Sequence, residues 1–291
     1  MPPDRPAPSR PATAIVTAVT MVAFASNSIL CRLALAGDSI DPIGFTTVRL
    51  AAGAITLLAI ARIGRRRRTA DRRGSWASGF ALFVYALGFS LAYVRLDAGV
   101  GALVLFGCVQ LTMIVRGFAG GERPDALQWA GLVTAAAGLV VLVSPGLTAP
   151  APMGSAMMAA AGIAWGVYSL RGRGARDPVI ATTDNFVRAV PMALAIAVVG
   201  VGRLHATPRG IALAVASGAI ASGIGYVLWY TALRGLSATR AASVQLTVPV
   251  IAAVGGIAVL SEIVTGRLAL ASTLVLGGVG ATLVGRMRRT G

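Results

Sequence analysis

Residues 76–94 read WASGFALFVYALGFSLAYV and contain no charged side chain. A stretch of this length and polarity can cross the hydrocarbon core of a bilayer as one helix, which takes about 20 residues. The same composition extends over the whole chain, since its 291 residues are 56% hydrophobic and only 12% charged. Charged residues supply about a quarter of an ordinary water-soluble domain. The sequence therefore predicts an all-α membrane protein with no separate soluble domain.

We predict ten transmembrane helices. Besides 76–94, the expected spans are 12–31, 42–61, 98–116, 127–144, 153–170, 178–200, 210–233, 241–261 and 268–285. The pairs Asp41-Pro42 and Asp177-Pro178 each place a capping carboxylate before a proline, an arrangement typical of a helix start. Residues 1–11, which are rich in proline, are expected to form a disordered cytoplasmic tail, and residues 286–291 a second cytoplasmic tail.

Arginine supplies all 26 basic residues against 10 acidic ones, a net charge of +16, so lysine-dependent chemistry is excluded. Nineteen arginines fall in the two tails and in every second connection, five fall on the opposite side, and two, Arg49 and Arg188, lie within spans. Cytoplasmic loops carry the excess of positive charge in membrane proteins. The bias therefore predicts a multi-pass protein of the cytoplasmic (inner) membrane with both termini in the cytoplasm. Because no aromatic-interleaved basic face accompanies these runs, the lipid bilayer and not nucleic acid is the expected partner.

An internal repeat relates the two halves of the chain. At an offset of 140 residues, four positions of the first half fall on identical residues of the second: Ala92 on Ala232, Leu96 on Leu236, Ala98 on Ala238 and Ala102 on Ala242. At an offset of 139, Arg32 falls on Arg171 and Arg49 on Arg188. Each half has five expected spans, an odd number, so residues 152–285 are predicted to lie inverted in the membrane relative to residues 12–145. Inverted repeats of this kind are typical of secondary transporters, whose substrate binds between the copies near the midplane.

Several short motifs resemble the EamA-type drug/metabolite transporter superfamily over essentially the whole chain. In the second half they are the run Tyr226 to Leu233, Ser237-Ala238, Pro249, Gly255-Gly256, Glu262, Gly277, Gly278 and Gly280. The first half matches more loosely through Ala92, Asp97-Ala98, Gly121-Glu122-Arg123 and Gly131 to Gly138. The resemblance implies a ten-helix carrier of small metabolites, often an exporter of amino acids or related compounds, with a central cavity lined by both halves.

Arg49 and Arg188 are the most informative of the possible site residues, because a charge at membrane depth costs a few kcal/mol even on the mildest scale. For Arg188 we expect a structural ion pair with Asp184, four residues earlier on the same helix. Arg49 has no acid at that spacing, and its side chain is expected to extend towards Asp38 or Asp41. A structural role is favoured for both arginines, and binding of a substrate carboxylate or phosphate is the alternative.

Three carboxylates are candidates for coupling or gating: Glu122, Glu262 and Asp184. The two glutamates follow the fourth and ninth spans, where pairing with the nearby Arg123 and Arg267 or capping of the next helix is the favoured interpretation. Asp184 is the acidic candidate at depth, and its neutralisation by Arg188 argues against proton coupling through it.

Polar and aromatic side chains within spans complete the set of cavity candidates, with helix packing as the alternative role for each. They are Asn27, Ser28, Tyr85, Gln110, Trp165, Tyr168, Asn185, Tyr226, Trp229, Tyr230 and Gln245. Buried amides are costly without partners, so Gln110 and Gln245 are expected either to bridge helices or to meet a substrate.

The sequence does not favour an enzyme, a cofactor or a metal site. His205 is the single histidine and falls in a loop, Cys31 and Cys108 fall in apolar stretches, and neither a G-x-S-x-G motif nor a P-loop occurs. We therefore predict a secondary transporter of small metabolites, an exporter, that works by alternating access as a monomer or weak homodimer. A non-transporting membrane protein for binding or assembly is the alternative.

Overall fold

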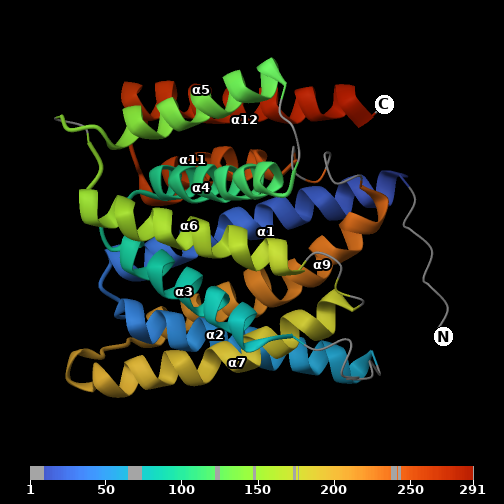
Figure 1. The fold of residues 1–291 in the computed structure, drawn as a ribbon. Coiled ribbons are helices and arrows are strands. Elements are labelled where there is room, and N and C mark those ends of the chain that lie inside the picture. Colours follow the sequence, from blue (N-terminus) through green and yellow to red (C-terminus); the bar gives the residue numbers. More distant parts are fainter. Residues whose placement is uncertain are drawn as a thin grey trace.

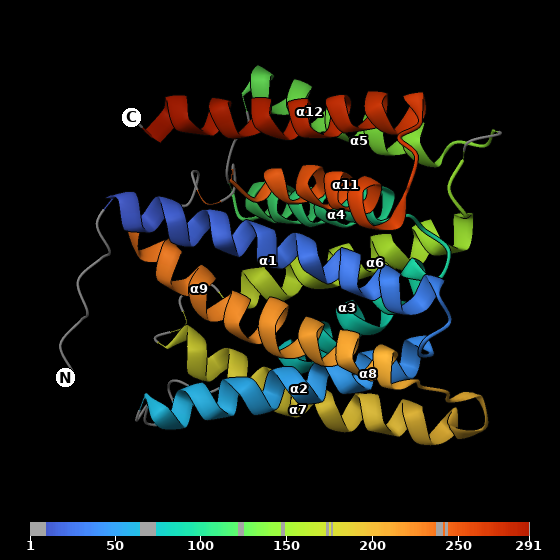
Figure 2. The ribbon, with the colours of Figure 1, turned by 180° about the vertical axis from the view of Figure 1, so that it is seen from behind.

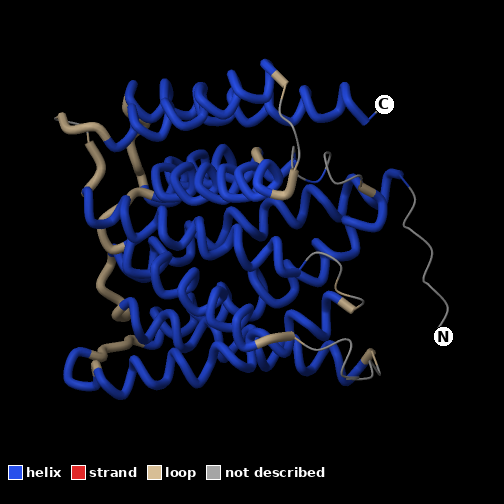
Figure 3. Tube along the Cα trace, in the orientation of Figure 1, coloured by secondary structure: helices blue, strands red, loops and turns tan. Residues whose placement is uncertain are grey.

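The computed structural model describes residues 10–64, 74–121, 125–146, 149–172, 175, 177–236, 241 and 244–290, without the side chains of Phe118, Arg203, Arg234 and residues 286–290. Within this part of the chain the structure consists of helices and loops, as Figure 3 shows, with one isolated β-bridge. The helices are Arg10–Ala36 (α1), Pro42–Ile63 (α2), Trp76–Tyr93 (α3), Ala98–Ala119 (α4), Ala126–Val143 (α5), Pro152–Gly172 (α6), Pro178–Val199 (α7), Pro208–Val215 (α8), Gly225–Ala232 (α9), Thr247–Leu260 (α11) and Gly266–Thr290 (α12). A π-helix, Ala216–Ile224 (η3), joins α8 to α9.

Nine helices of the described chain are long and apolar enough to cross a membrane, which confirms an all-helical protein with many membrane-spanning segments. The α8, η3 and α9 segments together form one of them, Pro208–Ala232. In the span expected at 241–261, residues 241, 244 and 245 are helical and residues 242–243 lie outside the described residues. The last helix of this span, α11, covers Thr247–Leu260. At 1.5 Å per residue its 14 residues cover about 21 Å, less than the roughly 30 Å hydrocarbon core.

The predictions for both chain ends need correction. Helix α1 begins at Arg10, so Arg10 and Pro11 are helical rather than part of a disordered tail; residues 1–9 of that predicted tail lie outside the described residues. Helix α12 continues to Thr290, so the backbone of residues 286–290 is helical where a tail was expected. In α12 the apolar pattern stops near Gly285, but backbone hydrogen bonding carries the helix further.

Side-chain caps fix several helix starts. Asp41 accepts hydrogen bonds from the backbone nitrogens of Ile43 at 3.0 Å and Gly44 at 2.8 Å at the start of α2. Asp177 does the same at the start of α7, with Val179 and Ile180 as donors. Each carboxylate thereby satisfies backbone donors that have no partner inside the helix.

The helices run side by side and reverse direction at each connection (Figures 1 and 2). Residues 37–41, 94–97, 200–207 and 261–265 gather at one end of the bundle, which we call the distal end. The start of α1 at Arg10 and the finish of α12 lie at the opposite end, which we call the terminal end. The position of a residue along the bundle is given by whether it lies nearer the distal end or the terminal end.

The two halves of the chain interleave. Helices α5 and α12 pair at one edge of the bundle, α4 and α11 lie next to them, and α2 and α7 pair at the opposite edge (Figures 1 and 2). Between these pairs, α1 packs on α11 and on the α8–η3–α9 column, and α6 packs on α4 and α3. The contact of α1 with α11 thus matches that of α6 with α4, and the contact of α1 with the α8–η3–α9 column matches that of α6 with α3.

The outer surface is strongly apolar. Large hydrophobic side chains stay exposed along outward helix faces, among them Ile55, Phe80, Val133 and Val198. An apolar surface of this extent is unfavourable in water and suits the lipid environment of a membrane protein.

Glycines allow α5 and α12 to pack with their backbones in close approach. A Cβ added at Gly278 of α12 would collide with the backbone nitrogen of Ala135 and the carbonyl oxygen of Gly131, both in α5. By contrast, a Cβ at Gly277 or Gly280 would meet no atom within 4 Å. Small residues at such positions drive helix association in membranes, where no hydrophobic force acts between helices.

We predict that Gly278→Ala destabilises the protein by about 1–3 kcal/mol, the usual cost of overpacking. Gly277→Ala and Gly280→Ala change the same residue type on the same helix, and they should leave stability unchanged or slightly raise it through higher helix propensity. Thermal unfolding of the three variants in detergent measures the difference. Equal midpoints for all three would contradict the close packing of α5 on α12.

Candidate functional site

Arg49 is a buried charge within α2. It lies seven residues after Pro42, the first residue of the helix, which is about 10 Å along the helix axis. The residue is only 2% exposed. Its Nη2 donates to the Tyr85 hydroxyl at 3.0 Å and contacts Ser222 Oγ at 3.5 Å, whereas the buried Nη1 has no hydrogen-bond partner. The guanidinium carbon lies 5.3 Å from the ring centre of Tyr85 and 4.8 Å from that of Phe89, within the range of cation–π attraction.

No carboxylate neutralises Arg49 within the part of the chain described. Its contacts are the hydroxyl groups of Tyr85 and Ser222 and the ring faces of Tyr85 and Phe89. The expectation that Arg49 reaches Asp38 or Asp41 is therefore wrong. Asp41 caps α2 and also accepts a hydrogen bond from the His205 backbone nitrogen, and Asp38 faces the His205 ring at 2.9 Å.

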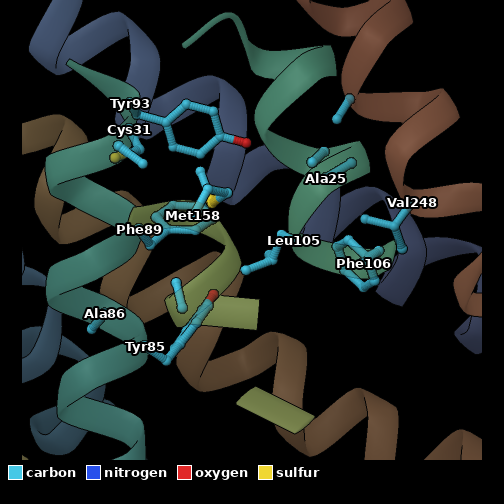
Figure 4. Packing of buried hydrophobic residues seen from close by; sticks show 14 of the residues in the cluster. Ala25, Cys31, Tyr85, Ala86, Phe89, Tyr93, Leu105, Phe106, Met158 and Val248 are labelled. Atoms are coloured by element: carbon cyan, nitrogen blue, oxygen red, sulfur yellow. The ribbon is translucent and has the colours of Figure 1, made fainter. Parts of the chain in front are cut away.

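The two rings that contact the Arg49 guanidinium, Tyr85 and Phe89, belong to a group of aromatic side chains that joins the two halves. Trp165 of α6 is central, with ring centroids 4.7 Å from Tyr85, 5.2 Å from Tyr168 and 5.4 Å from Tyr226. Figure 4 shows Tyr85, Phe89 and Tyr93 following one another along one face of α3. We call the following set the aromatic group: Phe24, Tyr85 and Phe89 from the first half, and Trp165, Tyr168, Phe186, Tyr226 and Trp229 from the second.

The π-helix η3 supplies hydroxyl groups beside Arg49. Ser217 and Ser222 both donate to the Oδ1 atom of Asn27 in α1, at 2.8 and 3.3 Å. The two serines are five residues apart, and the i→i+5 bonding of a π-helix places such residues on one face, where a regular α-helix would separate them. Asn27, Ser217, Ser222 and Arg49 therefore form one buried polar layer next to the aromatic group.

A cluster of charged side chains, Arg32, Asp97 and Glu262, lies at the distal end. The Glu262 carboxylate accepts a hydrogen bond from the Ala98 nitrogen at 2.9 Å, at the start of α4, and lies 3.5 Å from Arg32 Nε. Arg32 also donates to the Tyr93 carbonyl oxygen and lies 3.5 Å from Asp97. Partial burial raises the pKa of Glu262, and the Asp97 charge adds to this, outweighing the Ala98 and Arg32 contacts that lower it.

The described residues form a cavity at the terminal end. A cavity of about 680 Å³ lies there between α1 and α11. Its wall includes Thr13, Thr17 and Met21 of α1 and Thr247 and Ile251 of α11. At the distal end the backbones of Ile40 and Ala206 instead form an antiparallel bridge between the two halves. The two halves therefore join through their backbones at the distal end, and the cavity lies at the terminal end.

Two family matches cover most of the chain. The sequence profile of the EamA-like transporter family matches residues 12–144 and again residues 152–284. The chain belongs to the EamA-like transporter family. It is a multi-pass membrane transporter, and the family resemblance stated from the motifs is confirmed.

Three similar proteins illustrate how far the likeness extends in sequence and in fold. An uncharacterized protein of Pseudomonas aeruginosa is 46% identical over 277 residues, which cover 95% of this chain and 96% of that protein. A protein of Archaeoglobus fulgidus described as an uncharacterized transporter is 25% identical over 244 residues, covering 82% of this chain and 88% of the relative. A crystal structure with 21% sequence identity matches the fold with a TM-score of 0.66, covering 96% of this chain and 99% of that one.

Several other predicted site residues lie apart from Arg49. Arg188, its sequence counterpart, forms an ion pair at 3.6 Å with the buried Asp184 and lies over the exposed ring of Trp76. Asn185 accepts a hydrogen bond from the Ser75 nitrogen at 3.0 Å, where α3 begins. The structure thus places these residues of α7 in contacts that hold helices together.

The remaining candidates are distributed along the bundle. Ser28 is buried beside the Tyr93 hydroxyl, and the Tyr230 hydroxyl lies 3.0 Å from Thr182 Oγ1. Gln110 is buried in α4 and Gln245 is partly buried ahead of α11; among the described residues no hydrogen bond joins either amide to Arg49 or Asn27. Glu122 lies outside the described residues.

The expected partner of Glu262 also needs correction. Arg267, its neighbour in sequence, binds the carbonyl oxygens of Ser144 and Pro145 instead. Glu262 pairs with Arg32 and caps α4, which comes from the other half of the chain. Residues of the site that the sequence analysis missed are Phe24, Phe89, Phe186, Ser217 and Ser222.

We predict that the contribution of Glu262 to stability falls as pH rises. Because its pKa is raised in the folded protein, the folded state holds this proton more tightly than the unfolded chain. The free energy of unfolding should therefore decrease between the ordinary glutamate pKa of about 4.3 and the raised value. Thermal unfolding in detergent over a pH series, with Glu262→Gln as the reference, isolates this effect. A wild-type advantage over the variant that grows with pH would contradict it.

Proposed function

We propose that this EamA-family transporter moves a small polar or amphipathic metabolite by alternating access. The observation that carries the proposal is the position of Arg49 and the aromatic group, which lie where the two halves meet and contain residues of both. A relative movement of the halves would part these rings and expose the guanidinium. No chemical reaction is required of these residues, and we propose that the protein is not an enzyme.

The arrangement of the helices supports two inverted five-helix repeats, residues 12–145 and 152–285. Counterpart helices pair across the bundle as α2 with α7, α4 with α11 and α5 with α12. The members of each pair run in opposite directions, since α2 starts at the distal end and α7 at the terminal end (Figure 1). A two-fold axis in the membrane plane relates units arranged in this way, and rocking about such an axis interchanges two nearly equivalent states.

The two ends of the bundle support an assignment of the state. The distal end is closed by the Ile40–Ala206 bridge and by the Glu262–Ala98 hydrogen bond, and the 680 Å³ cavity lies towards the terminal end. Arginines such as Arg10, Arg62 and Arg171 lie at the terminal end, which the positive-inside rule assigns to the cytoplasm. We therefore propose an inward-facing state in the cytoplasmic membrane, which loads its substrate from the cytoplasm as an exporter does. One chain supplies both halves, so a monomer suffices.

A disulfide across the distal end provides a test of alternating access. Asp41 N–H donates to the His205 carbonyl at 3.0 Å and Thr207 N–H to the Ser39 carbonyl at 2.8 Å, so Ile40 and Ala206 form the close, non-hydrogen-bonded pair. The Cα atoms of such a pair are about 4.5 Å apart, within the range that a disulfide spans. We predict that the double variant Ile40→Cys/Ala206→Cys, once oxidised, loses at least nine-tenths of its transport and regains it on reduction.

The measurement compares metabolites outside and inside cells that express the wild type, the double variant or no protein. The two single-cysteine variants control for oxidation of Cys31 and Cys108. Full release by completely cross-linked protein would rule out opening at the distal end. Expression of the wild type without any change across a broad panel of metabolites would instead refute export and favour a binding or assembly function.

A further inference from the structure

We infer that the substrate is an organic monoanion whose carboxylate binds Arg49 and whose flat apolar body lies against the aromatic group. This inference rests on the proposed transport function and specifies its substrate class. It starts from the unmet hydrogen-bonding capacity of Arg49. A guanidinium has five N–H donors, and here the Nη1 atom is buried without an acceptor. A buried donor without a partner costs about 1–3 kcal/mol, more when it is charged.

The absence of a resident anion distinguishes Arg49 from the partly buried Arg32 and Arg188. Arg32 lies 3.5 Å from Glu262, and Arg188 lies 3.6 Å from Asp184. Within the described chain, Arg49 meets only the hydroxyl groups of Tyr85 and Ser222 and the faces of two rings. The structure thus retains a permanent positive charge at depth and leaves its counter-charge to be supplied from outside the chain.

The geometry of the group favours a carboxylate. The planar guanidinium presents two parallel N–H bonds that match the two oxygens of a carboxylate. One positive charge neutralises one negative charge, so a monoanion leaves a neutral site. A phosphate monoester, which carries more than one negative charge at neutral pH, would leave an excess negative charge in a region of low dielectric constant. A lipophilic cation would be repelled by Arg49.

The surroundings of Arg49 favour an apolar, flat body for the rest of the molecule. Trp165 and Tyr226 lie nearly parallel, at an interplanar angle of 23° and a centroid distance of 5.4 Å. Trp165 also contacts Tyr85, the hydroxyl of which binds Arg49. Ring faces carry negative electrostatic potential, so they repel a carboxylate and attract the positive edge of another ring. The carboxylate and the body of one ligand are therefore directed to different parts of the site.

The test measures binding to the full chain in detergent by tryptophan fluorescence. The probes share one body and differ in charge: phenylacetate, neutral phenylacetamide, cationic phenethylamine and phenyl phosphate. We expect phenylacetate to bind at least tenfold more tightly than the other three. Arg49→Gln should abolish that preference, because it removes the charge that selects the anion. Arg62→Gln, an exposed arginine at the end of the same helix, should behave like the wild type.

Arg49→Lys keeps the experiment decisive if Arg49→Gln does not fold. The lysine retains the charge but not the planar pair of donors, so selectivity for the anion should remain while affinity falls at least threefold. Equal affinities for phenylacetate and phenylacetamide, or unchanged anion binding in either Arg49 variant, would overturn the inference. Transport in cells separates the two proposals. Anion binding without any transport refutes the carrier, whereas transport of phenylacetate by Arg49→Gln at the wild-type rate refutes the anion site alone.

Discussion

A positive charge buried without an acid is the constraint on which the central part of this structure depends. A charged side chain at membrane depth is tolerated only where protein groups replace its water. Arg49 is held by the Tyr85 hydroxyl of α3, by Ser222 of η3 and by the ring faces of Tyr85 and Phe89. These contacts require α2, α3 and the α8–η3–α9 column to meet at one depth. The close approach of α2 to Gly218, where a Cβ would collide with the Arg49 carbonyl oxygen, brings η3 near enough.

The two halves differ most where the repeat would predict a second arginine. Between a Thr-Thr pair and the arginine, the second half contains three more residues than the first. Each of Asp184, Asn185 and Phe186 has a structural contact: Asp184 neutralises Arg188, Asn185 binds the start of α3, and Phe186 packs on Gly53 and on the Tyr226 ring. The insertion removes Arg188 from the site and leaves one charge there. The proposed anion site therefore contains one arginine, although Arg49 has a sequence counterpart in Arg188.

The sequence predicted nine of the ten expected spans, the Asp41 and Asp177 caps and the family, because these depend on composition and on neighbours along the chain. It did not predict contacts between distant residues. Glu262 pairs with Arg32, far away in the first half, although Arg267 is closer in sequence. The π-helix was also missed, since helical periodicity places Ser217 and Ser222 on different faces. Arg49 was expected to reach an aspartate, but Asp38 and Asp41 are occupied by His205 and the start of α2.

The positive charge of Arg49 also affects the energy of the movement proposed for the two halves. Without a ligand, closing the aromatic group around Arg49 encloses a net positive charge, and the buried Nη1 donor stays without an acceptor. With a monoanion bound, the same closure encloses a neutral, hydrogen-bonded pair, which is far less costly to remove from water than a lone ion. Differential stabilisation of this kind is the only way in which a ligand can shift a conformational equilibrium. Under the proposed mechanism, the loaded site passes through the occluded state more readily than the empty one, and the unpaired arginine would couple substrate binding to the movement of the halves.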